Sequence, residues 1–224
     1  MKRSKKLIAV LMTSILGVAL FLTGCGEKPA TADVTVKAFY NLYILGDSTD
    51  IEKIALTKDD VNQKLEEVKS LTESEIKSNF VAGGLSISDD QLDTIYNAEM
   101  EALKKLTVTT EIVPEDKDKA TVKLTTTYLD ITAIDNKAAK ETGDEVNAIS
   151  LTNQSELDNK IVEVYVNKLI EGFKAAQPSA ETKDETFECE KKTYAVDGKN
   201  KDIYAPVDME RFNTDINKMV TNQQ

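Results

Sequence analysis

Apolar residues recur every three or four positions in four segments before residue 107, a spacing that is typical of amphipathic helices. The predicted helices cover residues 33–45, 50–56, 57–80 and 88–106. The third and fourth begin with capping-box spacing, Thr57 with Asp60 and Ser88 with Gln91, although Asp is a less usual partner than Glu or Gln. The apolar face of the fourth comprises Leu92, Ile95, Tyr96, Leu103 and Leu106.

The period changes to two at Thr107, which predicts strands. Val108, Thr110 and Ile112 alternate with polar residues, and β-branched residues dominate. The polar residues 114–119 predict a turn, and residues 120–134 predict a returning strand. Together these segments predict an antiparallel hairpin.

The second half of the chain predicts a long helix, a second hairpin and a last helix. Residues 135–149 are assigned to a connection without an element. A helix follows over residues 153–176, then strands over 183–196 and 201–205 around a tight turn at Asp197-Gly198, and a helix that begins at Pro206. Because the strands come in hairpins, we predict an α+β fold in which a curved antiparallel sheet packs on long helices.

The N-terminus predicts a secretory signal peptide over residues 1–24. Four basic residues precede an apolar run that ends at Leu22-Thr23-Gly24-Cys25. A membrane-spanning helix is the alternative, but the uncharged stretch is at the lower limit of the required length and contains polar and small residues. We therefore expect cleavage between Gly24 and Cys25.

A cysteine directly after Leu-Thr-Gly resembles the lipobox of bacterial lipoproteins. This resemblance implies a diacylglycerol-modified, palmitate-bearing Cys25 that anchors the chain to the cell membrane on its extracytoplasmic side. Two acyl chains suffice for stable anchoring. Residues 25–32 then form a lipidated tether, and residues 33–222 a single α+β domain.

Composition restricts the chemistry open to the domain. The chain carries 39 acidic and 28 basic residues, for a net charge of −11, which argues against nucleic acid as a partner and favours solubility. It contains no histidine, which excludes Ser-His-Asp and Cys-His catalysis. Carboxylate, lysine, tyrosine and metal-carboxylate chemistry stay open, but no motif assigns a catalytic residue, a metal ligand or a cofactor.

Three groups of acids are candidate metal sites: Asp47 with Asp50, Glu115 with Asp116 and Asp118, and Asp197 with Asp202. They lack the spacing of a calcium loop and are interpreted as solvated turns. Cys189 lies in an alternating strand and is interpreted as a small buried residue, with a reactive thiol as the alternative.

Four aromatic residues are the candidate ligand pocket in the concavity of the sheet: Phe39, Tyr40, Tyr43 and Tyr96. Aromatic residues at helical spacing more often pack in a core. A hydrophobic core is therefore the alternative to a ligand pocket for these residues.

Beyond the lipobox, the helix over residues 34–47 and the alternating strand over Lys119–Thr126 resemble the opening and the sheet of small exported lipoproteins. The chain resembles, over residues 33–222, an uncharacterised Gram-positive lipoprotein domain, domain of unknown function 5105. The resemblance implies a cystatin-like or nuclear-transport-factor-like sheet around a long helix. It supplies no catalytic residues.

We predict a membrane-anchored, extracytoplasmic lipoprotein whose domain is a non-enzymatic binding or accessory module. Its partners are the membrane, through the lipid on Cys25, and other envelope proteins or a small ligand. One alternative is a carboxylate- or Tyr-dependent hydrolase or lyase of the cell envelope, which predicts two facing acids without a lysine nearby. The other is a small solute-binding lipoprotein of a transporter, which predicts two hinged lobes.

Overall fold

The computed structural model describes residues 30–54, 56–116, 119–150, 153–196 and 199–223. The helices within these residues are α1 (Ala32–Leu45), α2 (Thr49–Ile54), α3 (Lys58–Ala82), α4 (Asp89–Leu103), α5 (Ile131–Asn147), α6 (Gln154–Ala175) and α7 (Met209–Thr221). The strands are β1 (Val108–Asp116), β2 (Lys119–Thr127), β3 (Thr182–Val196) and β4 (Lys199–Pro206).

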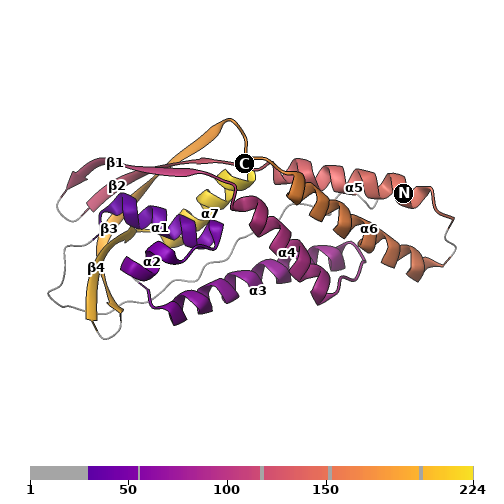
Figure 1. The fold of residues 1–224 in the computed structure, drawn as a ribbon, viewed down its shortest axis with the longest axis horizontal. Helices are drawn as coiled ribbons and strands as arrows, with labels where there is room; N and C mark the ends of the chain where they lie inside the picture. The colour runs from indigo at the N-terminus through magenta and orange to yellow at the C-terminus, as the bar shows by residue number, and fades with distance from the viewer. Residues whose placement is uncertain (1–29, 55, 117–118, 151–152, 197–198, 224) are drawn as a thin grey trace.

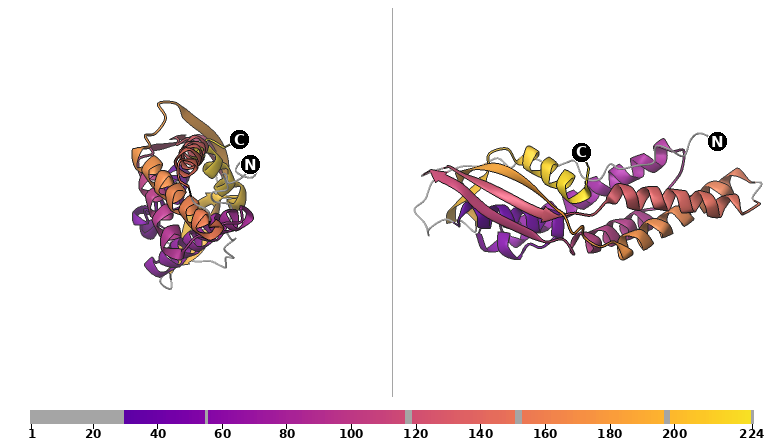
Figure 2. Two further views of the ribbon diagram at one scale, coloured as in Figure 1. Left: turned by 90° about the vertical axis from the view of Figure 1, so that its right-hand side faces the viewer. Right: turned by 90° about the horizontal axis from the view of Figure 1, so that it is seen from above.

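The molecule is elongated, with a curled sheet at one end and an arm of helices at the other (Figure 1). The sheet is antiparallel in the order β1-β2-β3-β4, so each strand pairs with its neighbour in sequence. The α3–α4 and α5–α6 hairpins extend from the sheet in the same direction, which the view from above also shows (Figure 2). The predicted α+β fold and its two β-hairpins are confirmed.

One face of the sheet packs against α1 and α7. Along β2 buried side chains alternate with more accessible ones, and Val122 lies opposite Phe187 of β3 on the buried face. Tyr40 of α1 donates to or accepts from Thr126 on this face, and Phe212 of α7 meets the Phe187 ring edge-on at 4.7 Å. Because Val122 and Thr126 share a face at period two, both helices cover the same side of the sheet.

The start of α1 contacts both outer strands of the sheet. Ala30 forms a parallel bridge with Ile203 of β4, and the Thr110 hydroxyl of β1 donates to the Asp33 carbonyl at 3.0 Å. Helix α1 is buried on most sides and is capped by Gly46, whose φ of 65° fits a residue without a Cβ. The chain therefore enters the fold between the two edges of the curl.

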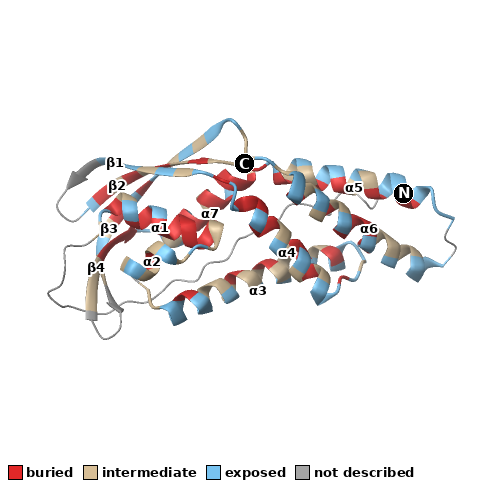
Figure 3. Ribbon diagram, viewed as in Figure 1, coloured by how far each residue is buried: buried red, intermediate tan, exposed pale blue. Residues whose placement is uncertain are grey.

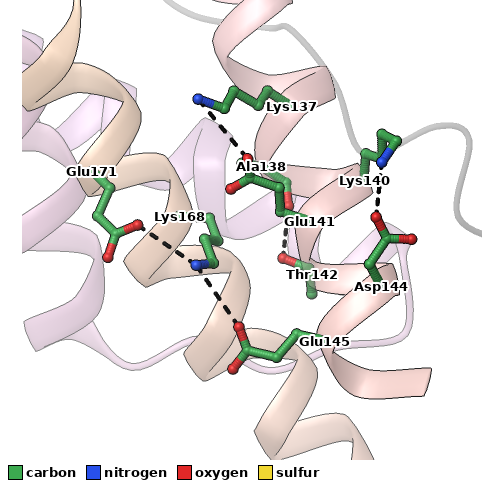
Figure 4. Close-up of polar contacts among 9 residues, drawn as sticks. All are labelled: Lys137, Ala138, Lys140, Glu141, Thr142, Asp144, Glu145, Lys168 and Glu171. Atoms are coloured by element: carbon green, nitrogen blue, oxygen red, sulfur yellow. Dashed lines mark hydrogen bonds and ion pairs between the residues drawn. The ribbon is translucent and has the colours of Figure 1, made fainter. Parts of the chain in front are cut away.

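Both capping boxes that the sequence predicted are present. Thr57 and Asp60 exchange side-chain-to-backbone hydrogen bonds at the start of α3, and Ser88 and Gln91 do so at the start of α4. In Figure 3, buried residues lie mainly on the faces of the arm helices that meet one another, and exposed residues lie on the outside of the arm. On the outside of α5 and α6, Lys168 lies between Glu145 and Glu171 (Figure 4).

The segment after β2 corrects two predictions. The predicted strand over residues 120–134 ends at Thr127, and the stretch assigned to a connection over 135–149 belongs mostly to helix α5. Asp130 caps this helix by accepting the Ala133 N–H at 2.9 Å. The cap outweighs the strand preference of the β-branched residues that follow it, and the buried residues then recur at helical spacing.

Smaller corrections concern helix ends. Pro206 is the last residue of β4, and α7 starts later, capped by Asp208 through the Arg211 N–H at 2.8 Å. Thr31 takes the N-cap position of α1, while Asp33 lies in the first turn, where its charge complements the helix dipole.

The predicted signal peptide, the lipobox and the turn at Asp197-Gly198 lie outside the described residues. In the part of the chain that the structure describes, none of the helices combines the length and the apolar character needed to cross a bilayer.

Candidate functional site

Three of the four candidate pocket residues lie together on α1. The Phe39 and Tyr43 rings stack with their centroids 6.1 Å apart, and both side chains are buried. Tyr40 is fully buried, and its hydroxyl lies 2.7 Å from the Thr126 hydroxyl. Burial raises the pKa of Tyr40 to about 12, so this phenol is neutral under physiological conditions.

The fourth residue, Tyr96, lies on α4 in a different setting. Its half-buried ring faces α3, where the Lys69 Nζ lies 5.9 Å from the ring centroid. The predicted group therefore combines three residues of α1 with one residue of α4 that contacts α3. The hypothesis that these aromatics bind a ligand stays a prediction.

Tyr96 belongs to what we call the α3–α4 cluster, comprising Lys69, Glu73, Asp93 and Tyr96. The Lys69 Nζ lies 2.5 Å from Asp93 Oδ1 and 3.7 Å from Glu73 Oε1. Helix α3 brings Lys69 and Glu73 to one face because they are four residues apart, and α4 does the same for Asp93 and Tyr96 at a spacing of three. The cluster joins the two helices of this hairpin.

The pKa values of the two acids of the α3–α4 cluster shift in opposite directions. The hydrogen bond from Lys69 lowers the pKa of Asp93 and raises that of Lys69. Partial burial, followed by the neighbouring Asp93 carboxyl, raises the pKa of Glu73. Two facing carboxyls of unlike pKa could divide acid and base roles. Here, however, Lys69 neutralises one of them, an arrangement suited to holding two helices together.

A buried acid that the sequence analysis missed lies one turn along α4 from Tyr96. Glu99 of α4 is 1% exposed, and its Oε2 atom is buried without a hydrogen-bond partner. Burial raises the pKa of Glu99 to about 8. The available signal was its position one turn from both Tyr96 and Leu103, within the apolar face of the predicted helix.

A second buried acid lies between α5 and α6. The Tyr165 hydroxyl donates a short hydrogen bond to Asp135 Oδ1, whereas Asp135 Oδ2 is buried without a partner. The Phe80 ring of α3 meets the Tyr165 ring edge-on at 5.7 Å. Burial raises the pKa of Asp135 although the Tyr165 bond opposes it, and burial also raises the pKa of Tyr165.

The acids weighed as metal sites have local partners where they are described. Asp47 Oδ1 accepts the Thr49 N–H at 2.9 Å, and Asp50 pairs with Lys53 at 3.2 Å. Asp202 accepts the Thr193 hydroxyl at 2.7 Å. Among the described residues, no group of three or more acids and cysteines is arranged to hold a metal ion.

Comparisons with known proteins give a family and a related structure. The family model for a domain of unknown function (DUF5105) matches residues 27–219. A crystal structure of a candidate lipoprotein, ycdA from Bacillus subtilis subsp. subtilis str. 168, superposes with a TM-score of 0.61 at 21% sequence identity. The match covers 84% of this chain and 55% of that one, so the chain spans about half the length of ycdA. No curated protein matches.

At this level of identity the similarity to ycdA shows the fold. The family match covers most of the chain and includes all seven helices and four strands that the structure describes, except the last two residues of α7. The chain belongs to the DUF5105 family.

Proposed function

We propose that this protein is a lipoprotein anchored by Cys25 to the extracytoplasmic side of the cell membrane, where its domain binds a partner without catalysing a reaction. The observation that carries the proposal is the lipobox at Leu22-Thr23-Gly24-Cys25, placed directly before the family domain. The structural similarity to ycdA, itself a candidate lipoprotein, supports it.

The entry point of the chain supports a domain held close to the bilayer. Ala30 is bridged to Ile203 and lies five positions after Cys25 in sequence. A chain of that length reaches about 18 Å when fully extended. The sheet end of the molecule would therefore lie near the membrane.

The described polar groups favour binding over catalysis. The α3–α4 cluster contains the kind of facing acid pair that the hydrolase alternative expects, but Lys69 lies 2.5 Å from Asp93. The hypothesis of a two-lobed solute-binding protein finds little support, because one cluster of buried residues includes side chains of both the sheet and the arm.

The anchor is tested by intact-protein mass spectrometry after palmitate labelling in a bacterial host. We expect the wild type to begin at Cys25 and to carry acyl chains, because a free thiol at this position is the acceptor that the lipobox implies. Cys25→Ala should lose the label and keep residues 1–24. Cys189→Ala is the matched control and should be labelled like the wild type.

A wild-type chain that keeps residues 1–24 and takes up no label would instead favour the membrane-spanning alternative.

The binding role is tested separately, by crosslinking and pull-down from intact cells and by thermal-shift screens with cell-wall fragments, peptides and small apolar ligands. Capture of a defined envelope protein or a ligand-induced shift supports the proposal, whereas turnover of a wall polymer contradicts it.

A further inference from the structure

Glu99 occupies a core position of α4. Its neighbours one turn away along the helix, Ile95 and Leu103, are 3% and 1% exposed, and both belong to the main cluster of buried apolar residues. Glu99 itself is as buried as Leu103, and its Oε2 atom has no hydrogen-bond partner. Because an unpaired, ionised carboxylate is strongly disfavoured in such a place, the neutral acid is the form that the packed helix accommodates.

The position of α4 gives this acid a mechanical setting. Helix α4 packs against α6 and α3 in the arm and also contacts α1, the helix that covers the sheet. It thus connects the two ends of the molecule. A charge that appears under α4 would act on the contacts that hold the arm to the sheet.

The charged and titratable groups around Glu99 provide no counter-charge. Tyr96 lies one turn away on α4, and burial, followed by the charge of Glu99, raises the pKa of this phenol. From α3, Lys69 faces Tyr96 and pairs with Asp93 and Glu73. Burial is the cause of the raised pKa of Glu99, with no opposing contribution from a described group of α1, α3 or α6.

We propose that Glu99 makes the packing of α4 proton-linked: its carboxyl is protonated while α4 lies against the core and loses the proton when α4 separates from it. The arm is then tightest in acid and loosens progressively as the pH rises through neutrality.

The sign follows from the pKa of Glu99 in the two states. In the packed state the pKa is about 8, and in an exposed Glu it is 4.5. Between these values the open state has lost the proton that the packed state keeps, so the packing equilibrium falls by up to tenfold per pH unit as pH rises. The contribution is complete below about pH 4.5 and is lost above about pH 8.

Hydrogen exchange followed by mass spectrometry tests this linkage on the full chain extracted in mild detergent. Exchange times at pH 6.5 and 8.5 are scaled for the intrinsic rate of the amides. We expect the wild type to show at least tenfold faster exchange of α4 and α6 peptides at pH 8.5, with β2 and β3 peptides unchanged. In Glu99→Gln, which keeps the shape but cannot ionise, this pH dependence should be absent.

Glu101→Gln is the matched control, because Glu101 is exposed on the same helix and pairs with Lys104 at 2.6 Å. It should behave like the wild type. A Glu99→Gln protein with the same pH dependence as the wild type overturns the proposal, and so does a wild type whose scaled α4 exchange is independent of pH.

A measurement on the wild type keeps the proposal testable if Glu99→Gln does not fold. The infrared absorption of a protonated carboxyl should persist in the folded protein above pH 7 and lose about half of its intensity near pH 8. Asp135 is also buried, with Tyr165 as its partner, so Asp135→Asn identifies its share of the band. Absence of a protonated carboxyl at pH 7 overturns the proposal.

Discussion

At the scale of single residues, Cys189 shows how burial silences a reactive group. The thiol is fully buried on β3 opposite Ala120, and its Sγ lies 3.8 Å from the Phe187 carbonyl. Burial raises the pKa of Cys189 to about 12, although the Lys192 charge opposes the shift. The interpretation as a small buried residue is confirmed. Burial keeps reagents away from the thiol and disfavours its reactive thiolate form.

We therefore expect Cys189 to resist alkylation in the folded protein. In a Cys25→Ala background, where Cys189 is the remaining thiol, a thiol reagent at pH 8 should modify it at least 100-fold more slowly in buffer than in about 8 M urea. Reaction in buffer should require unfolding and follow its rate. Rapid stoichiometric labelling of the folded chain would restore the hypothesis of a reactive thiol.

At the scale of helices, two glycines differ in the space around them. One lies where two helices approach closely, and the other has room for a side chain. Gly172 of α6 faces α5, and a Cβ built on it would lie 2.7 Å from Ile134 Cγ2. Gly143 of α5 is exposed, and a Cβ there would meet no atom within 4 Å. The first glycine permits the α5–α6 packing, whereas the second only weakens its helix.

Alanine substitutions should therefore act in opposite directions. We expect Gly143→Ala to stabilise the fold by roughly 0.5–1 kcal/mol through helix propensity. Gly172→Ala gains the same propensity, but the clash with a β-branched side chain should cost about 1–3 kcal/mol and leave a net loss. Urea unfolding followed by circular dichroism measures both changes. A stabilised Gly172→Ala protein would show that the helices separate easily.

At the scale of the whole molecule, excess negative charge opposes the compact state. The chain carries a net charge of −11, and the ion pairs on its surface involve partly or largely exposed side chains. Exposed pairs contribute about 0–1 kcal/mol each. Repulsion among the unpaired acids acts over longer distances.

Salt should therefore stabilise the protein. Raising the ionic strength from about 0.01 M to about 0.15 M shortens the Debye length from roughly 30 to 8 Å, which screens the repulsion more than the contacts between paired groups. We expect the melting temperature to rise by a few degrees, equally with sodium and potassium chloride. A fall in the melting temperature would mean that the surface ion pairs contribute more than the repulsion costs.

The order of most elements could be read from the sequence because their signals are local. The capping boxes at Thr57 and Ser88 need only residues three positions apart, and the alternation in β2 needs only its own side chains. Helix α5 was missed because Ile131 and Ile134 carry strand propensity. The cap at Asp130 and the packing of α5 on α6 together favour the helix.

The aromatic site shows the same division. The sequence placed Phe39, Tyr40 and Tyr43 on one helix, and that spacing is correct. It could not tell that Tyr96 contacts Lys69 instead, since the pairing of α3 with α4 is a contact between separate elements. The sequence analysis also missed Glu99. A glutamate is usually exposed, but the position of Glu99 on the apolar face of α4 places it in the core.

By itself, then, the sequence determined the lipobox, the acidic balance, the absence of histidine, the caps and the hairpins, because each depends on residue identity or on neighbours a few positions apart. Only the tertiary structure decided how the sheet curls around α1, how the helices of the arm pack together, and which carboxyl groups are buried away from solvent. Those outcomes depend on distant surfaces meeting, and the free energy of a buried charge is set by what surrounds it in space.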